Sequence, residues 1–91
     1  MAEQVTMVVW KFPLPFPGLN VLEMPEGAEV LTVQMQGDYP VLWALCNPDA
    51  PKQTRTFLQV MTGHWLTHRP GRYVATVQVG DLVVHVFEEA V

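Results

Sequence analysis

The stretch that most constrains the fold is residues 28–46, which read AEVLTVQMQGDYPVLWALC. Two apolar runs flank Gly37-Asp38, and a glycine-containing pair supplies the positive φ that a two-residue hairpin turn needs. Pairing outward from this turn places Val30 opposite Leu45. Because side chains alternate between the two faces of a strand, one face is mixed around Trp43 and the other is apolar. The apolar, core-facing set is Leu31, Val33, Met35, Leu42 and Ala44.

Length and composition indicate one small domain spanning residues 1–91, with residues 1–4 expected as a loose tail. Nearly half of the residues are apolar, which excludes a disordered chain. Cys46 is the single cysteine, so no disulfide framework is possible and a reducing compartment fits. A basic leader and a long apolar run are both missing, so we expect a cytoplasmic protein with no membrane contact.

The rest of the chain also predicts strands. Prolines at positions 13, 15 and 17 favour an extended crossover, and Gly80-Asp81 predicts a second hairpin that pairs Val77 with Val84. No segment keeps a helical period over ten or more residues without a proline or glycine. The expected strands are residues 5–12, 19–24, the two arms of 28–46, 54–62, 72–79 and 82–88. The sequence therefore predicts an all-β fold, a compact antiparallel sandwich or partly open barrel of six to seven strands.

Composition excludes some function classes. The chain contains no serine, which removes serine-based triad hydrolases. The formal net charge of −4 argues against general nucleic-acid binding, which needs a basic field along the phosphates. The charge is nevertheless uneven, because residues 47–72 carry +3 while the segments before and after them are acidic.

The candidates for metal binding and catalysis are weak. His64 and His68 have the i, i+4 spacing of paired metal ligands, but no HExxH glutamate accompanies them and the only thiol lies elsewhere. Cys46 lies at a strand end without basic neighbours in the sequence, unlike a reactive thiolate. We therefore expect no catalytic residues, no metal and no cofactor, and a metal-assisted hydrolase using the histidines remains the least favoured alternative.

One cluster has the parts of a binding site. It combines two guanidiniums, a small-residue turn with free backbone N–H groups, an imidazole and an aromatic plane, which suit an anionic, ring-containing ligand. An acidic patch on a partner protein would use the same parts, and an ordinary surface loop that offsets the acidic rest is the plain alternative. The candidate residues are Arg55, Thr62, Gly63, His64, Trp65 and Arg72, with Trp43 on the mixed hairpin face as a further contact.

Several blocks occur in a recognisable order along nearly the whole chain. They are Lys11-Phe12-Pro13-Leu14, MPEGAEVL at 24–31, LWALCNP at 42–48, Arg55-Thr56-Phe57, Thr62-Gly63-His64 and His85-Val86-Phe87-Glu88. In this order the chain resembles a family of uncharacterised proteins of about this length that tailed bacteriophages and prophages encode. The resemblance implies a phage origin and a role inside the infected cell, and it implies no reaction.

Together these observations favour a non-enzymatic, phage-encoded accessory protein that binds a host or phage protein or associates with itself. The alternative is sequestration of a small phosphorylated or nucleotide-like ligand through the cluster around His64. On either hypothesis, replacing Arg55 and Arg72 together by alanine is expected to leave folding intact.

Overall fold

The fold was obtained as a computed structural model, which describes residues 6–15 and 17–90. The expected loose tail at residues 1–4 lies outside the described residues. The strands are β1 (Val8–Pro13), β2 (Gly18–Pro25), β3 (Glu29–Gln36), β4 (Tyr39–Cys46), β5 (Lys52–Met61), β6 (Arg72–Val79) and β7 (Leu82–Glu89).

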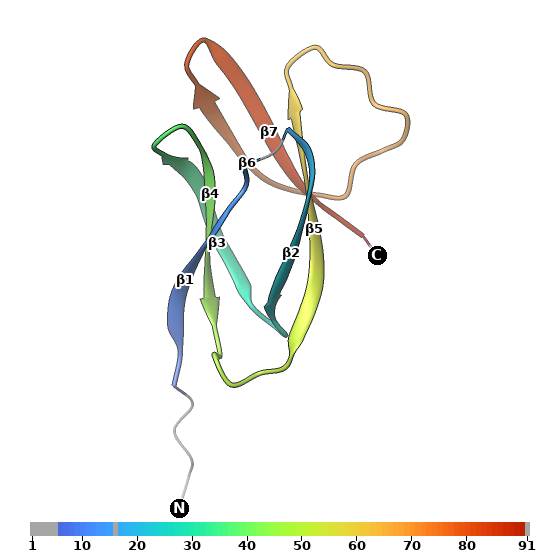
Figure 1. The fold of residues 1–91 in the computed structure, drawn as a ribbon. Coiled ribbons are helices and arrows are strands. Elements are labelled where there is room, and N and C mark those ends of the chain that lie inside the picture. Colours follow the sequence, from blue (N-terminus) through green and yellow to red (C-terminus); the bar gives the residue numbers. More distant parts are fainter. Residues whose placement is uncertain (1–5, 16, 91) are drawn as a thin grey trace, which may run out of the picture.

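The strands form two antiparallel sheets, ordered β1-β4-β3 and β2-β5-β7-β6. β3 and β6 lie side by side but belong to different sheets, so the barrel is not closed by a continuous ladder (Figure 1). The all-β prediction of a sandwich or partly open barrel is confirmed. Within the described residues there is no helix long and apolar enough to cross a membrane.

The register of the first hairpin differs from the prediction beyond Thr32. Thr32 pairs with Trp43 as expected, but a bulge at Leu31 shifts the pairing, so that Val30 lies opposite Ala44 instead of Leu45. A bulge adds one unpaired residue and turns it out of the alternating pattern. Leu31 is therefore 47% exposed, and its predicted place in the core is wrong.

The bulge in β3 faces a second bulge in β6, between Tyr73 and Ala75. Both bulged segments line the same small cleft, where the two edge strands approach each other. Bulges increase local twist and disrupt pairing at sheet edges. The paired bulges therefore lie where the two sheets remain separate.

The remaining boundaries differ from the expected ones at the strand ends. Residue 5, the expected start of the first strand, lies outside the described residues, and residues 6 and 7 are not in a strand. β1 begins at Val8 and extends through Pro13, which an edge strand tolerates. β5 covers residues 52–61, so Thr62 lies just beyond it. The second hairpin has the predicted register, with Val77 opposite Val84. Residues 62–71 form a long loop without helix, which stands away from the sheets in Figure 1.

The core lies between the inner faces of the two sheets. Phe57 of β5 and Leu42 of β4 are fully buried at its centre, with Met24 and Val86 beside them. One end of the core is covered by the β2–β3 turn and the β4–β5 loop. A hydrogen bond from the Glu26 N–H to the Pro51 carbonyl joins the two segments. We call this the closed end, and the opposite end, where the hairpin turns lie, the open end.

Candidate functional site

A pocket of about 500 Å³ opens at the open end, between the two sheets. Its walls are mostly apolar and come from four separate parts of the chain, which is the usual character of a binding pocket. The lining residues are Leu14, Pro15, Pro17 and Gly18 of the crossover, Asp38, Tyr39 and Pro40 after the first turn, Leu58, Gln59, Val60, Met61 and His64 at the end of β5, and Val79, Leu82 and Val84 of the second hairpin.

Leu14 fixes the crossover as one wall of this pocket. Its N–H donates to the Pro40 carbonyl at 2.9 Å, and its own carbonyl accepts from the Gln59 side-chain amide at 2.9 Å. The first bond ends on β4 and the second begins on β5, so one residue joins both sheets. Leu14 and Gln59 are both buried, where polar groups need partners. Leu14 is therefore held between the two sheets, and this wall of the pocket is fixed by the fold.

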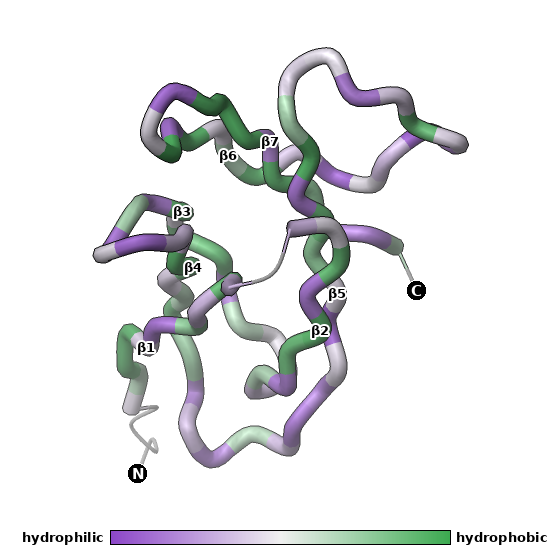
Figure 2. Tube along the Cα trace, turned by 45° about the horizontal axis from the view of Figure 1, so that its top comes forward, coloured by the Kyte–Doolittle hydropathy of each residue, from purple (hydrophilic) through white to green (hydrophobic). Residues whose placement is uncertain are grey.

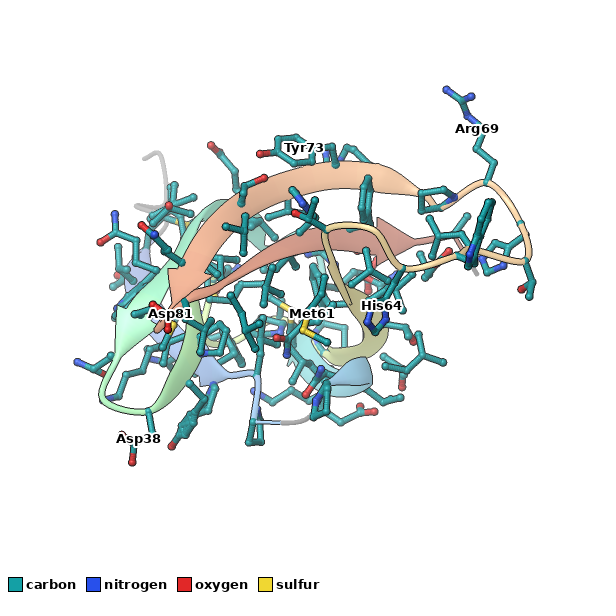
Figure 3. The ribbon with its side chains drawn as sticks, turned by 90° about the horizontal axis from the view of Figure 1, so that it is seen from above. Asp38, Met61, His64, Arg69, Tyr73 and Asp81 are labelled. Atoms are coloured by element: carbon teal, nitrogen blue, oxygen red, sulfur yellow. The ribbon has the colours of Figure 1, made fainter. Side chains whose placement is uncertain are left out.

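The rim of the open end carries two carboxylates on one side, and the loop that leaves from the other side carries Arg69. Figure 3 shows Asp38 and Asp81 on one side, Met61 and His64 nearer the middle, and Arg69 on the extended loop. Asp38 lines the pocket and Asp81 lines a shallower neighbouring cleft. Figure 2 marks both hairpin turns as hydrophilic. The loop of residues 62–71 contains no acidic residue.

That loop begins with a tight turn that positions His64. The His64 N–H donates to the Met61 carbonyl at 3.1 Å, and Gly63 has a φ of 89°, a left-handed conformation that favours glycine. The turn places His64 on the pocket wall, while Trp65 next to it is 98% exposed. The loop returns to β6 through Gly71, where an added Cβ would collide with the Glu88 carbonyl.

Arg55, the first predicted contact, lies toward the closed end. Its Nε and Nη2 donate to both carboxylate oxygens of Glu88, at 2.6 and 2.8 Å, and its Nη1 donates to the Ala28 carbonyl at 2.6 Å. The two charged side chains are only 13% and 18% exposed. Arg72 adds a longer contact to Glu88 at 3.2 Å. The Arg55 guanidinium therefore joins β5 to β7 and to the segment that leads into β3.

The Arg55–Glu88 contact shifts both groups toward their charged forms. Hydrogen bonding to Glu88 raises the pKa of Arg55, although burial acts in the opposite direction. The Arg55 hydrogen bonds likewise lower the pKa of Glu88, against the effect of burial, and Arg72 contributes in the same sense. The pair is therefore charged at neutral pH.

The structure divides the predicted cluster into two groups. Arg55 and Arg72 meet on Glu88, whereas Thr62, Gly63, His64 and Trp65 lie at or near the open end. Arg55 and Met61 are six positions apart on β5, a separation of about 20 Å along a strand. Trp43 lies elsewhere, half-buried between Lys11 and Thr32 on the outer face of the β1-β4-β3 sheet.

Sequence reasoning missed a row of polar contacts on the outer face of the other sheet. The Thr62 hydroxyl lies 2.7 Å from His85 Nε2, and His85 Nδ1 lies 3.0 Å from the Thr76 hydroxyl, which in turn contacts Tyr73. The signal was available in the predicted register, because pairing Val77 with Val84 also places Thr76 opposite His85, and paired residues share a face. This row fixes Thr62, the residue from which the loop departs.

The described part of the chain brings together no three His, Cys, Asp or Glu side chains that could hold a metal ion. His68 instead lies 3.4 Å from Glu89. Cys46 is buried in β4, and its thiol contacts the Ala44 carbonyl.

The fold and the open end define a small all-β protein with a preformed apolar pocket beside an exposed aromatic loop. A family profile described as a domain of unknown function (DUF7352) matches residues 6–91, and the chain belongs to this family. Neither the curated proteins nor the solved structures contain a match to the chain.

The geometry of Arg55 predicts the opposite of the sequence-based expectation for its removal. Arg55→Ala removes the main partner of the mostly buried Glu88 carboxylate and the donor to the Ala28 carbonyl. We therefore expect the free energy of unfolding to fall by about 2–3 kcal/mol. Lys11→Ala is the control, since it removes a basic side chain whose hydrogen bond to Gln36 is exposed, and it is expected to change the free energy of unfolding by less than about 0.5 kcal/mol. Urea denaturation measures both, and equal stability of the two variants would contradict a structural role for Arg55.

Acidification should weaken the same contact. Because the folded state lowers the pKa of Glu88, its contribution to stability is complete above the ordinary glutamate pKa of about 4.3 and is lost as the pH falls through the lower folded value. We expect the stability difference between the wild type and Glu88→Gln to shrink below about pH 4. Denaturation curves across this range measure it, with the exposed Glu26→Gln as the control. A difference that is constant with pH would contradict the assignment.

Proposed function

We propose that this chain is a non-enzymatic binding protein whose open end holds a protein partner. The open end offers a preformed apolar pocket and, directly beside it, a loop with an unburied tryptophan. The proposed partner is a protein of the phage or the host, or a further copy of the chain itself.

The observation that carries the proposal is the exposure of Trp65. A tryptophan that is 98% exposed contributes almost nothing to the fold, and the adjacent Leu66 is also exposed. Tryptophan is enriched among the residues that dominate binding energy at protein interfaces, where it is buried in a pocket or under a partner. An exposed Trp-Leu pair beside an apolar pocket therefore supports protein binding at this end.

The cellular setting belongs to the same proposal. The ordered blocks at residues 24–31 and 42–48 resemble proteins of tailed bacteriophages and prophages, which supports a phage-encoded accessory role in the cytoplasm of the infected bacterium. The single cysteine is reduced and buried, which is compatible with that compartment.

A small phosphorylated or nucleotide-like ligand has less support. The pocket wall is mostly apolar, and the charged side chain on it is Asp38, which repels an anion. The two guanidiniums of the predicted cluster, Arg55 and Arg72, both contact Glu88. His64 and the backbone of its turn are the remaining groups that such a ligand would use.

Trp65→Ala tests the proposal directly. The tagged protein is produced in bacteria together with untagged copies and purified by its tag. We expect the wild type to retain a defined set of proteins, and Trp65→Ala to lose most of that set because it lacks the exposed tryptophan side chain. Mass spectrometry of the retained proteins, untagged copies included, measures the difference. Val21→Ala is the control, since it shortens a 64% exposed apolar side chain on β2, away from the loop and the pocket.

Retention that is unchanged in Trp65→Ala would contradict the proposed binding surface. Retention of nothing by the wild type would contradict protein binding altogether. In that case, a rise in melting temperature with a nucleotide or cyclic nucleotide would support the small-ligand alternative, because a ligand that binds the native state stabilises it.

A further inference from the structure

The chemistry of the open end defines what its pocket accepts. The walls near the mouth include Tyr39, Met61 and Leu82, which favour an apolar or aromatic group. Asp38 lines the same pocket and Asp81 projects from the neighbouring turn, so a positive charge next to that apolar group is favoured. The pocket therefore suits an aromatic side chain followed closely by a basic residue.

The loop of residues 62–71 presents this combination to solvent. Trp65 and Leu66 are exposed, and the Arg69 side chain extends from the same loop in Figure 3. Of the four basic residues in the segment 47–72, Arg69 alone has no carboxylate or aromatic partner among the described residues. Trp65 does not fill the pocket of its own chain, since it is 98% exposed while its neighbour His64 lines the wall.

We propose that two copies of this chain form a two-fold dimer in which each inserts Trp65 into the pocket of the other. The inference rests on the proposed function and names the partner as a second copy. A two-fold interface is self-complementary, because residue i of one chain contacts residue j of its partner and the reverse. The loop and the pocket are adjacent on one molecule, because His64, next to Trp65, lines the pocket wall, so a two-fold axis between them would bring each loop to the pocket of the partner.

Size and charge agree with this pairing. An indole fits within a pocket of about 500 Å³, and a buried tryptophan removes about 150–250 Å² of its surface from water. In the exchanged pair, the loop of one chain, with Arg69 and no acidic residue, faces the rim of the other, with Asp38 and Asp81. Opposite charges at the rim favour encounter and fix the orientation of the partners.

Sedimentation velocity of the purified full-length chain over a range of concentrations is the first measurement. We expect a reversible monomer–dimer equilibrium and a blue shift of tryptophan emission as the dimer forms, because Trp65 leaves water. Trp65→Ala is expected to weaken dimerisation at least about 30-fold, the loss typical of one interface hot spot. Because Trp65 is exposed in the monomer, this variant is expected to fold normally.

A mixing experiment tests the reciprocal exchange. Leu82→Arg places a charge at the pocket mouth, at a side chain that is 53% exposed, and is expected to block the pocket without unfolding the protein. Each variant alone lacks both Trp–pocket contacts of the dimer. A mixture of Trp65→Ala with Leu82→Arg restores one of them, since the intact Trp65 of the second variant enters the open pocket of the first. The mixture is therefore expected to form more dimer than either variant alone, and Val21→Ala, on the distant strand β2, is expected to dimerise like the wild type.

Charge reversal tests the orientation. Arg69→Asp is expected to weaken the dimer, and combining it with Asp38→Lys is expected to recover part of the loss. Added salt should weaken the wild-type dimer, since the rim charges are exposed to screening.

The outcomes separate the inference from the proposed function. A chain that stays monomeric at every concentration, or a dimer that Trp65→Ala leaves unchanged, overturns the exchange. A mixture of variants that forms no more dimer than its components also overturns it. If purified protein is monomeric while retention of a different protein depends on Trp65, the proposed function stands and only the identity of the partner is wrong.

Discussion

At the closed end, the two sheets are connected by the Arg55 side chain, which its ion pair with Glu88 inside one sheet holds against the Ala28 carbonyl beside the other. One guanidinium joins β5 to β7 through two bonds and reaches the Ala28 carbonyl, at the entry to β3 in the other sheet. Lys52, whose ammonium lies 4.9 Å from the centre of the Trp10 ring, adds a second tie between the sheets at the same end. The basic character of the segment 47–72 is thus largely used to hold the closed end together.

The open end is built differently, and its structure explains why a pocket persists there. Leu14 joins the sheets through its backbone alone, with Pro40 on one side and Gln59 on the other. Its bonds fix the crossover but leave the space beside it lined with apolar side chains. Charged side chains therefore connect the sheets at the closed end, whereas apolar surface stays accessible at the open end. The exposed loop lies beside the open end.

The local features of the fold could be predicted from the sequence because they depend on neighbouring residues. Gly37-Asp38 and Gly80-Asp81 determine their own turns, and the second hairpin has the predicted register. The bulge at Leu31 could not be predicted, since it belongs to the place where the edges of β3 and β6 meet across the two sheets. The same limit explains the register error beyond Thr32.

The candidate site was predictable only in part, for the same reason. The loop with His64 and Trp65 is marked by its glycines and its lack of strand pattern, so it was found. The ion-pair partner of Arg55 could not be predicted, because Glu88 is 33 residues away and no local pattern shows which carboxylate a guanidinium contacts. The pocket was missed entirely, since its walls combine the crossover, two turns and the end of β5.

Whether two copies of the chain associate through the open end is tested most directly by the backbone amide NMR spectrum recorded during serial dilution of the protein. If they do, dilution shifts the amides of residues 62–71 together with those of Asp38 and Leu82 on the rim. Amides of Val21 on the edge strand β2 and of Tyr73 on the outer sheet face should stay in place. Shifts confined to β2, with the loop and rim unchanged, would show that the chain associates through the exposed edge of this strand and not through the open end.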